Sequence, residues 1–256
     1  MAKTSTSWQQ VGSWYGELVG EEGHYHHRHQ IFPKLLPLLN WCEQGAIKLL
    51  DLACGEGVLA RQMPPNIAYV GVDAAPSLIQ RARSLDKEPH HRYLLGDITQ
   101  PITALPEASF THATIILALQ NIAAPLSALQ NAQHLLTTDG RLILVLNHPC
   151  FRIPRQSHWG VDAAKKLQYR RIDRYMTAME IPIQMHPGKN NSPLTTSFHH
   201  PLSTWAAMLY KAGFLIELLE EWCSDKASSG RNKKMEDRSR EEFPLFLAIR
   251  AVKKAV

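Results

Sequence analysis

The sequence predicts an α/β fold in which helices cover both faces of a mostly parallel sheet. Between residues 46 and 150, short apolar runs alternate with stretches of helical pattern. This alternation is typical of right-handed strand–helix–strand crossovers, which produce parallel strands. The runs are apolar throughout rather than at every second residue, which indicates strands that are buried on both faces. We therefore expect residues 46–150 to form the core of the protein.

The expected elements of this core follow one another along the chain. The apolar runs predict strands at residues 47–53, 67–74, 92–98, 112–119 and 141–147. The stretches between them predict helices at residues 57–63, 77–85 and 125–136. Gly140 is expected just beyond the last of these helices, because glycine readily adopts the left-handed conformation that ends a helix.

Residues 1–45 are expected to form an N-terminal helical lid. Large apolar residues recur at helical spacing in "WQQVGSWYGELV", residues 8–19. "EEG" then interrupts the pattern, and a second helix is expected to begin near Pro33. Proline fits the first turn of a helix better than its interior, which favours this starting point.

Residues 151–200 depart from the alternation of strands and helices. Arginines and lysines are interleaved there with Trp159, Tyr169 and Tyr175, and "MHPGKNNSP" is a strong turn signal. The segment is too long for a bare connection in a compact domain, so we expect an inserted cap that is partly strand. Residues 201–256 should complete the core with a helix ended by Gly213 and the strands "FLIELLEEW" and "PLFLAIRAV".

Composition narrows the class of protein. Apolar residues make up 45% of the chain, but no apolar run is long enough to cross a bilayer. The first ten residues contain no apolar signal core, so we expect a cytoplasmic protein. The four cysteines form no CxxC pair, which argues for reduced thiols and against a zinc ribbon. The histidines cluster without the spacing of metal ligands on a helix, and no metal site is expected.

The stretch "LLDLACGEGVLA", residues 49–60, has the pattern of a strand, a glycine turn and a helix that binds a nucleotide. A Walker-type phosphate loop is excluded because no Gly-Lys-Ser/Thr follows the turn. A dinucleotide fingerprint matches on paper, but Glu56 and Asp51 would face its pyrophosphate. One such pair of like charges costs about 3 kcal/mol at roughly 6 Å. S-adenosylmethionine, with its sulfonium and ammonium groups, suits these acids better.

Two further acids end the next strands. Asp73 follows the second apolar run, where an acid can hold both ribose hydroxyls. Asp97 follows the third, where its side chain can accept a hydrogen bond from the adenine amino group while the Ile98 amide meets a ring nitrogen. Capping of the next helix is the alternative interpretation of Asp73.

"LLDLACGEG", "VGVDAAPSLIQRAR" and "LLGDI" together resemble the class I S-adenosylmethionine-dependent methyltransferases. The chain is most similar to the small-molecule branch that contains the ubiquinone/menaquinone-biosynthesis methyltransferases. The likeness covers residues 46–150 and the terminal pair of strands, but not residues 151–200. It implies a Rossmann-like, seven-stranded sheet with an antiparallel last strand. It also implies S-adenosylmethionine as the cofactor and S-adenosylhomocysteine as the product.

The resemblance also assigns the parts of the cofactor to residues. The methionine part is assigned to Asp51, Ala53, Gly55 and Gly57, the ribose to Asp73, and the adenine to Ala74, Asp97 and Ile98. The end of the fourth strand, Leu117 and Ala118, is assigned to a position along the methionine, with Gln120 and Asn121 nearby on the substrate side.

Candidates for chemistry and for closure of the site lie outside these motifs. His148 ends the fifth strand and is our candidate for a catalytic base, with a capping role as the alternative. Arg152 is the candidate for binding an anionic substrate, with simple solvation as the alternative. Tyr15, His27 and His29 are the expected cofactor contacts of the lid, with helix packing and a polar loop as alternatives.

The methyl acceptor is expected to be a small aromatic or carboxylated molecule, since basic and aromatic residues are mixed in residues 151–200. RNA is the alternative, because single-stranded bases also bind to such surfaces. A non-catalytic regulator that binds S-adenosylmethionine is a third possibility. "LALQNIAAP" lacks the Asn/Asp-Pro-Pro-Tyr/Phe motif of DNA amino-methylases. No membrane partner is expected, and both a monomer and a homodimer remain open.

Overall fold

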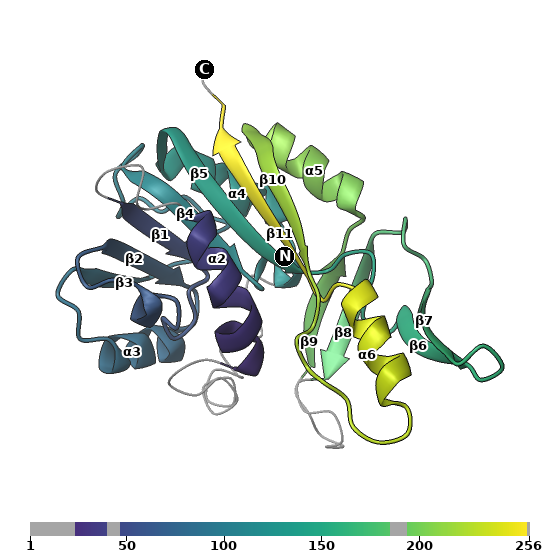
Figure 1. Ribbon diagram of the computed structural model, residues 1–256. Coiled ribbons are helices and arrows are strands. Elements are labelled where there is room, and N and C mark those ends of the chain that lie inside the picture. The colour runs from purple at the N-terminus through teal and green to yellow at the C-terminus, as the bar shows by residue number, and fades with distance from the viewer. Residues whose placement is uncertain (1–23, 40–46, 185–193, 255–256) are drawn as a thin grey trace.

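The computed structural model describes residues 24–39, 47–184 and 194–254 of the chain (Figure 1). The helical elements are η2 (π-helix, His27–Ile31), α2 (Phe32–Leu38), η3 (3-10, Ala60–Gln62), α3 (Pro76–Leu85), η4 (3-10, Leu119–Asn121), α4 (Pro125–Leu135), α5 (Leu202–Lys211) and α6 (Lys233–Glu242). The strands are β1 (Lys48–Leu52), β2 (Ala68–Asp73), β3 (His91–Leu95), β4 (Phe110–Ile116), β5 (Leu136–Asn147), β6 (Ser157–Asp162), β7 (Leu167–Ile172), β8 (Met179–Gln184), β9 (Leu194–His199), β10 (Phe214–Trp222) and β11 (Phe246–Lys253).

A seven-stranded sheet in the order β10-β11-β5-β4-β1-β2-β3 forms the centre of the protein. Strands β1 to β5 pair in parallel, and β11 runs antiparallel to both of its neighbours, β5 and β10. The predicted Rossmann-like α/β fold with an antiparallel last strand is confirmed. Because parallel strands end at one edge, the residues that follow β1, β2, β4 and β5 meet there.

Two apolar layers enclose the sheet, as its uninterrupted apolar runs predicted. Residues of α4 and α5 pack on one face of the sheet, together with side chains of β4, β5 and β11. Residues of η2, α2 and α3 pack on the other face. Leu49, Leu50 and Leu52 of β1 are fully buried. Burial on both faces explains why this strand shows no polar alternation in the sequence.

Three local predictions need correction. Residues 57–63 form turns and the short η3 rather than a regular helix. Gly140 does not end a helix: α4 stops at Leu135, residues 136–140 already belong to β5, and Asp139 has the positive φ of 61°. α2 begins at Phe32, next to Pro33 as expected, but the π-helical turn η2 precedes it directly.

Residues 151–200, predicted as a cap, contain two β-hairpins within their described part. β6 pairs with β7, and β8 pairs with β9, both antiparallel and outside the main sheet. In Figure 1 the β6–β7 hairpin projects away from the body of the protein. The boundaries proposed for the lid, core and cap remain predictions.

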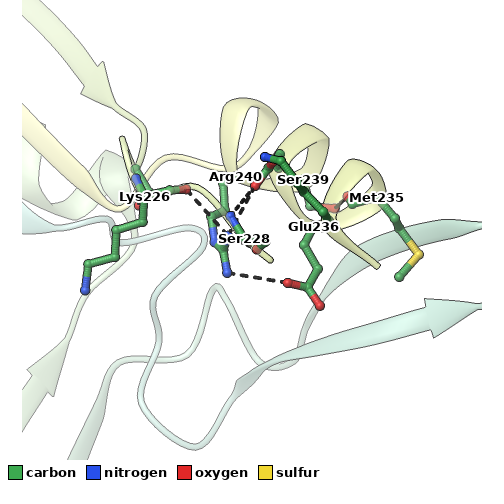
Figure 2. Close-up of polar contacts among 9 residues, drawn as sticks. Lys226, Ser228, Met235, Glu236, Ser239 and Arg240 are labelled. Atoms are coloured by element: carbon green, nitrogen blue, oxygen red, sulfur yellow. Dashed lines mark hydrogen bonds and ion pairs between the residues drawn. The ribbon is translucent and has the colours of Figure 1, made fainter. Parts of the chain in front are cut away.

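The segment that connects β10 to α6 is fastened to that helix (Figure 2). The Arg240 guanidinium donates to Ser228 Oγ and lies 3.7 Å from the Glu236 carboxylate. Ser239 Oγ in turn donates to the Gln168 carbonyl of β7 at 3.1 Å, so α6 also holds the β6–β7 hairpin. Among the residues that the structure describes, no helix has the length and apolar content needed to cross a bilayer.

Candidate functional site

The glycine turn after β1 is built from residues with left-handed backbone. Ala53, Gly55 and Gly57 have φ values of 59°, 58° and 72°. The Cys54 amide donates to the Val72 carbonyl of β2 at 3.0 Å, which holds the turn against the neighbouring strand. Backbone of this shape approaches a ligand closely because two of the three positions carry no side chain.

Asp51 lies at the floor of the turn and is 3% exposed. Its carboxylate accepts hydrogen bonds from Tyr69 Oη at 2.7 Å and from Thr114 Oγ1 at 2.8 Å. Both donors come from neighbouring strands, and Thr114 stands directly beside Asp51 in the β1–β4 register. Burial raises the pKa of Asp51 to about 6, although the two hydrogen bonds act in the opposite direction.

Asp51 is expected to make folding stability depend on pH. Its folded pKa of about 6 lies above the ordinary aspartate pKa of 3.8, so folding favours the protonated carboxyl. The free energy of unfolding should therefore fall by about 3 kcal/mol as the pH rises from about 4 to about 6. In Asp51→Asn this part of the fall should disappear. Urea unfolding of both proteins from pH 4 to pH 7 measures the difference, and parallel curves would contradict the assignment.

Glu56 has a different role from the one that the sequence suggested. Its side chain is fully buried, and the carboxylate lies 2.5 Å from Arg81 Nε of α3. Arg61 also donates to the Glu56 carbonyl at 2.6 Å. The nearby guanidinium offsets the charge of Glu56, so repulsion of a pyrophosphate by this residue no longer supports the choice of ligand. Asp51 is the acid that still supports the argument against a pyrophosphate at the glycine turn.

The ends of β2 and β3 place Asp73 and Asp97 at the same edge of the sheet. Asp73 accepts from the Gly55 and Ala75 amides, each at 2.9 Å, and thereby joins the glycine turn to the end of β2. Burial raises the pKa of Asp73, and these amides oppose the shift. The N-cap of α3 is Ala75, so Asp73 is not at the capping position. Asp97 is half-buried, and one of its oxygens accepts from the amide and hydroxyl of Thr99.

The end of β4 carries the next group of predicted residues. Leu117 has a φ of 51°, and its carbonyl accepts from Gln120 Nε2 at 2.7 Å and from Asn121 Nδ2 at 3.4 Å. Both amide side chains thus hold the strand end in shape. Ala118 is half-buried beside them, while Ile98 of the β3 end is 4% exposed and Ala74 of the β2 end is exposed.

A pocket opens above the glycine turn, and we call it the β1 pocket. It is lined by His27, Phe32, Asp51, Ala53, Cys54, Gly55, Glu56, Val58, Leu59 and Ile116. The turn η2 brings His27 into this lining, and its contact with a cofactor stays a prediction. His29 is exposed and packs against Tyr25, so the structure does not bring it to the pocket. Tyr15 lies outside the described residues.

His27 lines the β1 pocket as a neutral imidazole. Burial and the neighbouring His24 and His26 lower its pKa to about 4. Its ring stacks on Phe32, and its Nδ1 is buried without a hydrogen-bond partner among the described residues. Within the same described part of the chain, no three His, Cys, Asp or Glu side chains are grouped as a metal site.

The residues of this edge fit S-adenosylmethionine. A neutral imidazole and a buried carboxylate at the β1 pocket are compatible with a cationic methionine part. Each Asp73 oxygen accepts one backbone hydrogen bond and retains a second lone pair for a ribose hydroxyl. The unpartnered His27 Nδ1 offers the pocket a further polar contact.

A second pocket lies at the end of β5, and we call it the β5 pocket. It is lined by Gln120, Leu146, Asn147, Pro149, Arg152, Pro154, Ser197, Phe198, His199, His200 and Trp205. Two predicted substrate residues, Gln120 and Arg152, are therefore brought together here. The Arg152 guanidinium lies 5.3 Å from the centre of the Phe246 ring.

His148, predicted as a base, is not placed to act as one. The residue is fully buried, and its Nε2 lies 2.7 Å from the Glu221 carboxylate. Its Nδ1 accepts from the Cys150 amide at 3.2 Å, which places the ring proton on Nε2. Both ring nitrogens are therefore occupied, and the contact with Glu221 joins the end of β5 to β10. His148 does not line the β5 pocket. The capping interpretation describes it better.

Sequence reasoning missed most of the residues that support these positions. Tyr69 and Thr114 interrupt otherwise apolar strands, and such polar residues beside an acidic strand end are a usable signal. Ser197, His199 and His200 come from a segment whose path over the sheet is not encoded in any local pattern.

The central part of the chain is similar to a known protein family. Residues 50–144 match a family model described as a methyltransferase domain. The likeness to a methyltransferase domain therefore covers the central part of the chain. The matched residues begin in β1 and end in β5, and they include the glycine turn, Asp73 at the end of β2 and Asp97 after β3. The domain is similar to the class I S-adenosylmethionine-dependent methyltransferases, as the sequence motifs indicated.

Several of the similar curated proteins are named as methyltransferases of quinone biosynthesis. The chain is 27% identical over 107 residues to the ubiquinone/menaquinone biosynthesis C-methyltransferase UbiE of Citrifermentans bemidjiense. This alignment covers 40% of this chain and 46% of that protein. It is 30% identical over 105 residues to a demethylmenaquinone methyltransferase of Chlamydia muridarum, covering 40% and 45% of the two chains. The alignments thus span about half the length of these relatives.

Solved structures show the same fold over more of the chain. An S-adenosylmethionine-dependent methyltransferase from Mesorhizobium loti superimposes with a TM-score of 0.65 at 24% identity. The match covers 85% of this chain and 96% of the other. At this level of identity the likeness establishes the fold alone.

Proposed function

We propose that the protein transfers a methyl group from S-adenosylmethionine to a small-molecule acceptor. The observation that carries the proposal is the joining of the glycine turn to two acidic strand ends. Asp51 lies under the turn, and Asp73 accepts a hydrogen bond from the Gly55 amide within it. This edge therefore presents carboxylates and backbone amides together, as an adenosyl amino acid requires.

Bound S-adenosylmethionine would supply a methyl group on a positively charged sulfur. In such a transfer the acceptor's nucleophilic atom would bond to the methyl carbon as the carbon–sulfur bond breaks, and the electron pair of that bond would stay on sulfur. The protein has to align the reactants and exclude water. Its residues divide this work: the β1 pocket holds the amino-acid end, and Asp73 and Asp97 orient the nucleoside. No side chain has to change its protonation state if the acceptor is already a good nucleophile.

Calorimetry of the purified protein tests the cofactor. S-adenosylmethionine and S-adenosylhomocysteine should bind with a stoichiometry of one, whereas NAD should show no saturable heat. Tight binding of NAD without binding of S-adenosylmethionine would overturn the proposal. Transfer of a labelled methyl group to a metabolite extract tests catalysis. A protein that binds the cofactor but labels no small molecule would instead be an RNA enzyme or a regulator, which labelling of total RNA distinguishes.

A further inference from the structure

The two pockets differ in their charged and polar side chains. The β1 pocket includes Asp51 and Glu56. The described lining of the β5 pocket contains no aspartate or glutamate, but it contains one guanidinium, two imidazoles, a hydroxyl and two amide side chains. A pocket without acids around an arginine favours a negatively charged ligand.

Arg152 has no carboxylate partner among the described residues. Its guanidinium lies over the face of Phe246, with 5.3 Å from the guanidinium carbon to the ring centre. Burial, and then the neighbouring Arg170, lowers the pKa of Arg152. A cation in such a place is costly unless a counter-ion completes it. The guanidinium offers a planar, two-pronged set of donors that matches a carboxylate.

Unpartnered buried atoms give an independent sign that a ligand completes this pocket. Gln120 is 8% exposed, and its Oε1 is buried without a partner among the described residues. His200 Nδ1 is in the same situation. Native interiors rarely leave such atoms unsatisfied unless water or a ligand meets them.

Gln120 also connects the two pockets. Its Nε2 donates to the Leu117 carbonyl at 2.7 Å, and Ile116, next to Leu117, lines the β1 pocket. A molecule in the β5 pocket that contacts Gln120 is therefore near the end of β4, where the methyl group is expected under the proposed function.

We propose that the β5 pocket binds the methyl acceptor and that this acceptor carries a carboxylate held by Arg152. The inference rests on the proposed function for the presence of a methyl donor. The contact between this carboxylate and Arg152 lets the protein recognise the acceptor. Gln120 Oε1 accepts a hydrogen bond from an N–H or O–H group of the acceptor that lies nearer to the methyl donor.

Charge fractionation of a metabolite extract from the source organism tests the class of acceptor. The extract is passed over an anion exchanger at pH 8, and each fraction is incubated with the protein and methyl-labelled S-adenosylmethionine. Label is expected in the retained fraction. Amidation of carboxylates in that fraction should abolish labelling, whereas treatment with phosphatase should leave it unchanged. Label in the flow-through, or loss after phosphatase, would overturn the carboxylate assignment while the proposed function stands.

Variants of Arg152 locate the binding. Arg152→Gln should raise the KM for the purified acceptor about tenfold or more, because a charge-assisted, two-pronged contact is lost. Arg152→Lys should recover part of the loss. Arg171→Gln is the matched control: it removes the same charge from an exposed β7 side chain that does not line the pocket.

Binding of the acceptor to protein saturated with S-adenosylhomocysteine provides a readout that does not depend on turnover. The Kd should rise in Arg152→Gln to the same extent as the KM, whereas affinity for S-adenosylhomocysteine and the melting temperature should match those of Arg171→Gln. An unchanged acceptor Kd would overturn the role of Arg152. Failure to bind S-adenosylhomocysteine at all would count against the proposed function itself.

Discussion

Replacing Gly57 by alanine should cost about 3 kcal/mol of folding stability. Gly57 has a φ of 72°, and a Cβ added there would lie 2.5 Å from Tyr93 Oη and 2.8 Å from the ring carbon Cε1. The strained backbone and the overlap with a buried ring both act against the folded state. The ring has little room to retreat, because Tyr93 is 6% exposed and its hydroxyl is bonded to Asp86. Urea unfolding followed by circular dichroism measures the loss.

Gly230 provides a matched control for this substitution. Its φ is 79°, but nothing lies within 4 Å of the position of an added Cβ. Gly230→Ala should therefore cost only about 1 kcal/mol, which is the price of left-handed backbone. Adding Tyr93→Val to Gly57→Ala should remove the overlap, so the double variant should be more stable than the sum of the single changes predicts. Equal losses at Gly57 and Gly230 would contradict the packing argument.

Asp73→Asn should weaken the binding of S-adenosylmethionine about 100-fold. Under the proposed function, the Asp73 carboxylate accepts hydrogen bonds from two ribose hydroxyls, and charge-assisted bonds of this kind contribute roughly 1.5–3 kcal/mol each. In the structure the two oxygens also accept from the Gly55 and Ala75 amides. Asparagine keeps only one acceptor oxygen, and its NH2 group would face one of these backbone N–H donors. Isothermal titration calorimetry measures the change in Kd.

The control for Asp73 is a charge removal away from the site. Glu107→Gln changes a side chain that is 75% exposed and paired with His134. It should leave the affinity for S-adenosylmethionine within about twofold of the wild type. Melting temperatures of both variants separate a loss of contact from a loss of fold. If Asp73→Asn binds S-adenosylmethionine as tightly as Glu107→Gln, the ribose assignment is wrong.

The main sheet could be predicted from the sequence because its strands are short, apolar and buried on both faces. β1, β2, β4 and β5 all contain apolar runs without polar alternation. In a chain of this length, few structures other than buried strands fit such short runs. The acids at the ends of the strands could also be predicted from the sequence. A residue at the carboxyl end of a parallel strand lies at the ligand edge of the sheet whatever the details of the loops.

Other features depended on contacts that no local pattern reveals. Glu56 reads as an exposed acid in a glycine turn, yet Arg81 of the next helix pairs with it. His148 reads as a free imidazole at a strand end, yet Glu221 from a distant strand occupies its Nε2. Asp139, rather than Gly140, takes the left-handed conformation near the start of β5. For Glu56 and His148, a partner from another element decides the outcome.

The position of β11 has a consequence for the synthesis of the protein. Phe246–Lys253 forms hydrogen-bonded ladders with both β5 and β10, although it follows both in the chain. On the ribosome, β10 therefore has no neighbour in the main sheet until this strand has emerged. Leu215 and Leu219, already half-exposed in the finished protein, would be bare in a nascent chain that stops before residue 246. We expect such arrested chains to be bound by chaperones and to resist proteolysis only in the segment from β1 to β5.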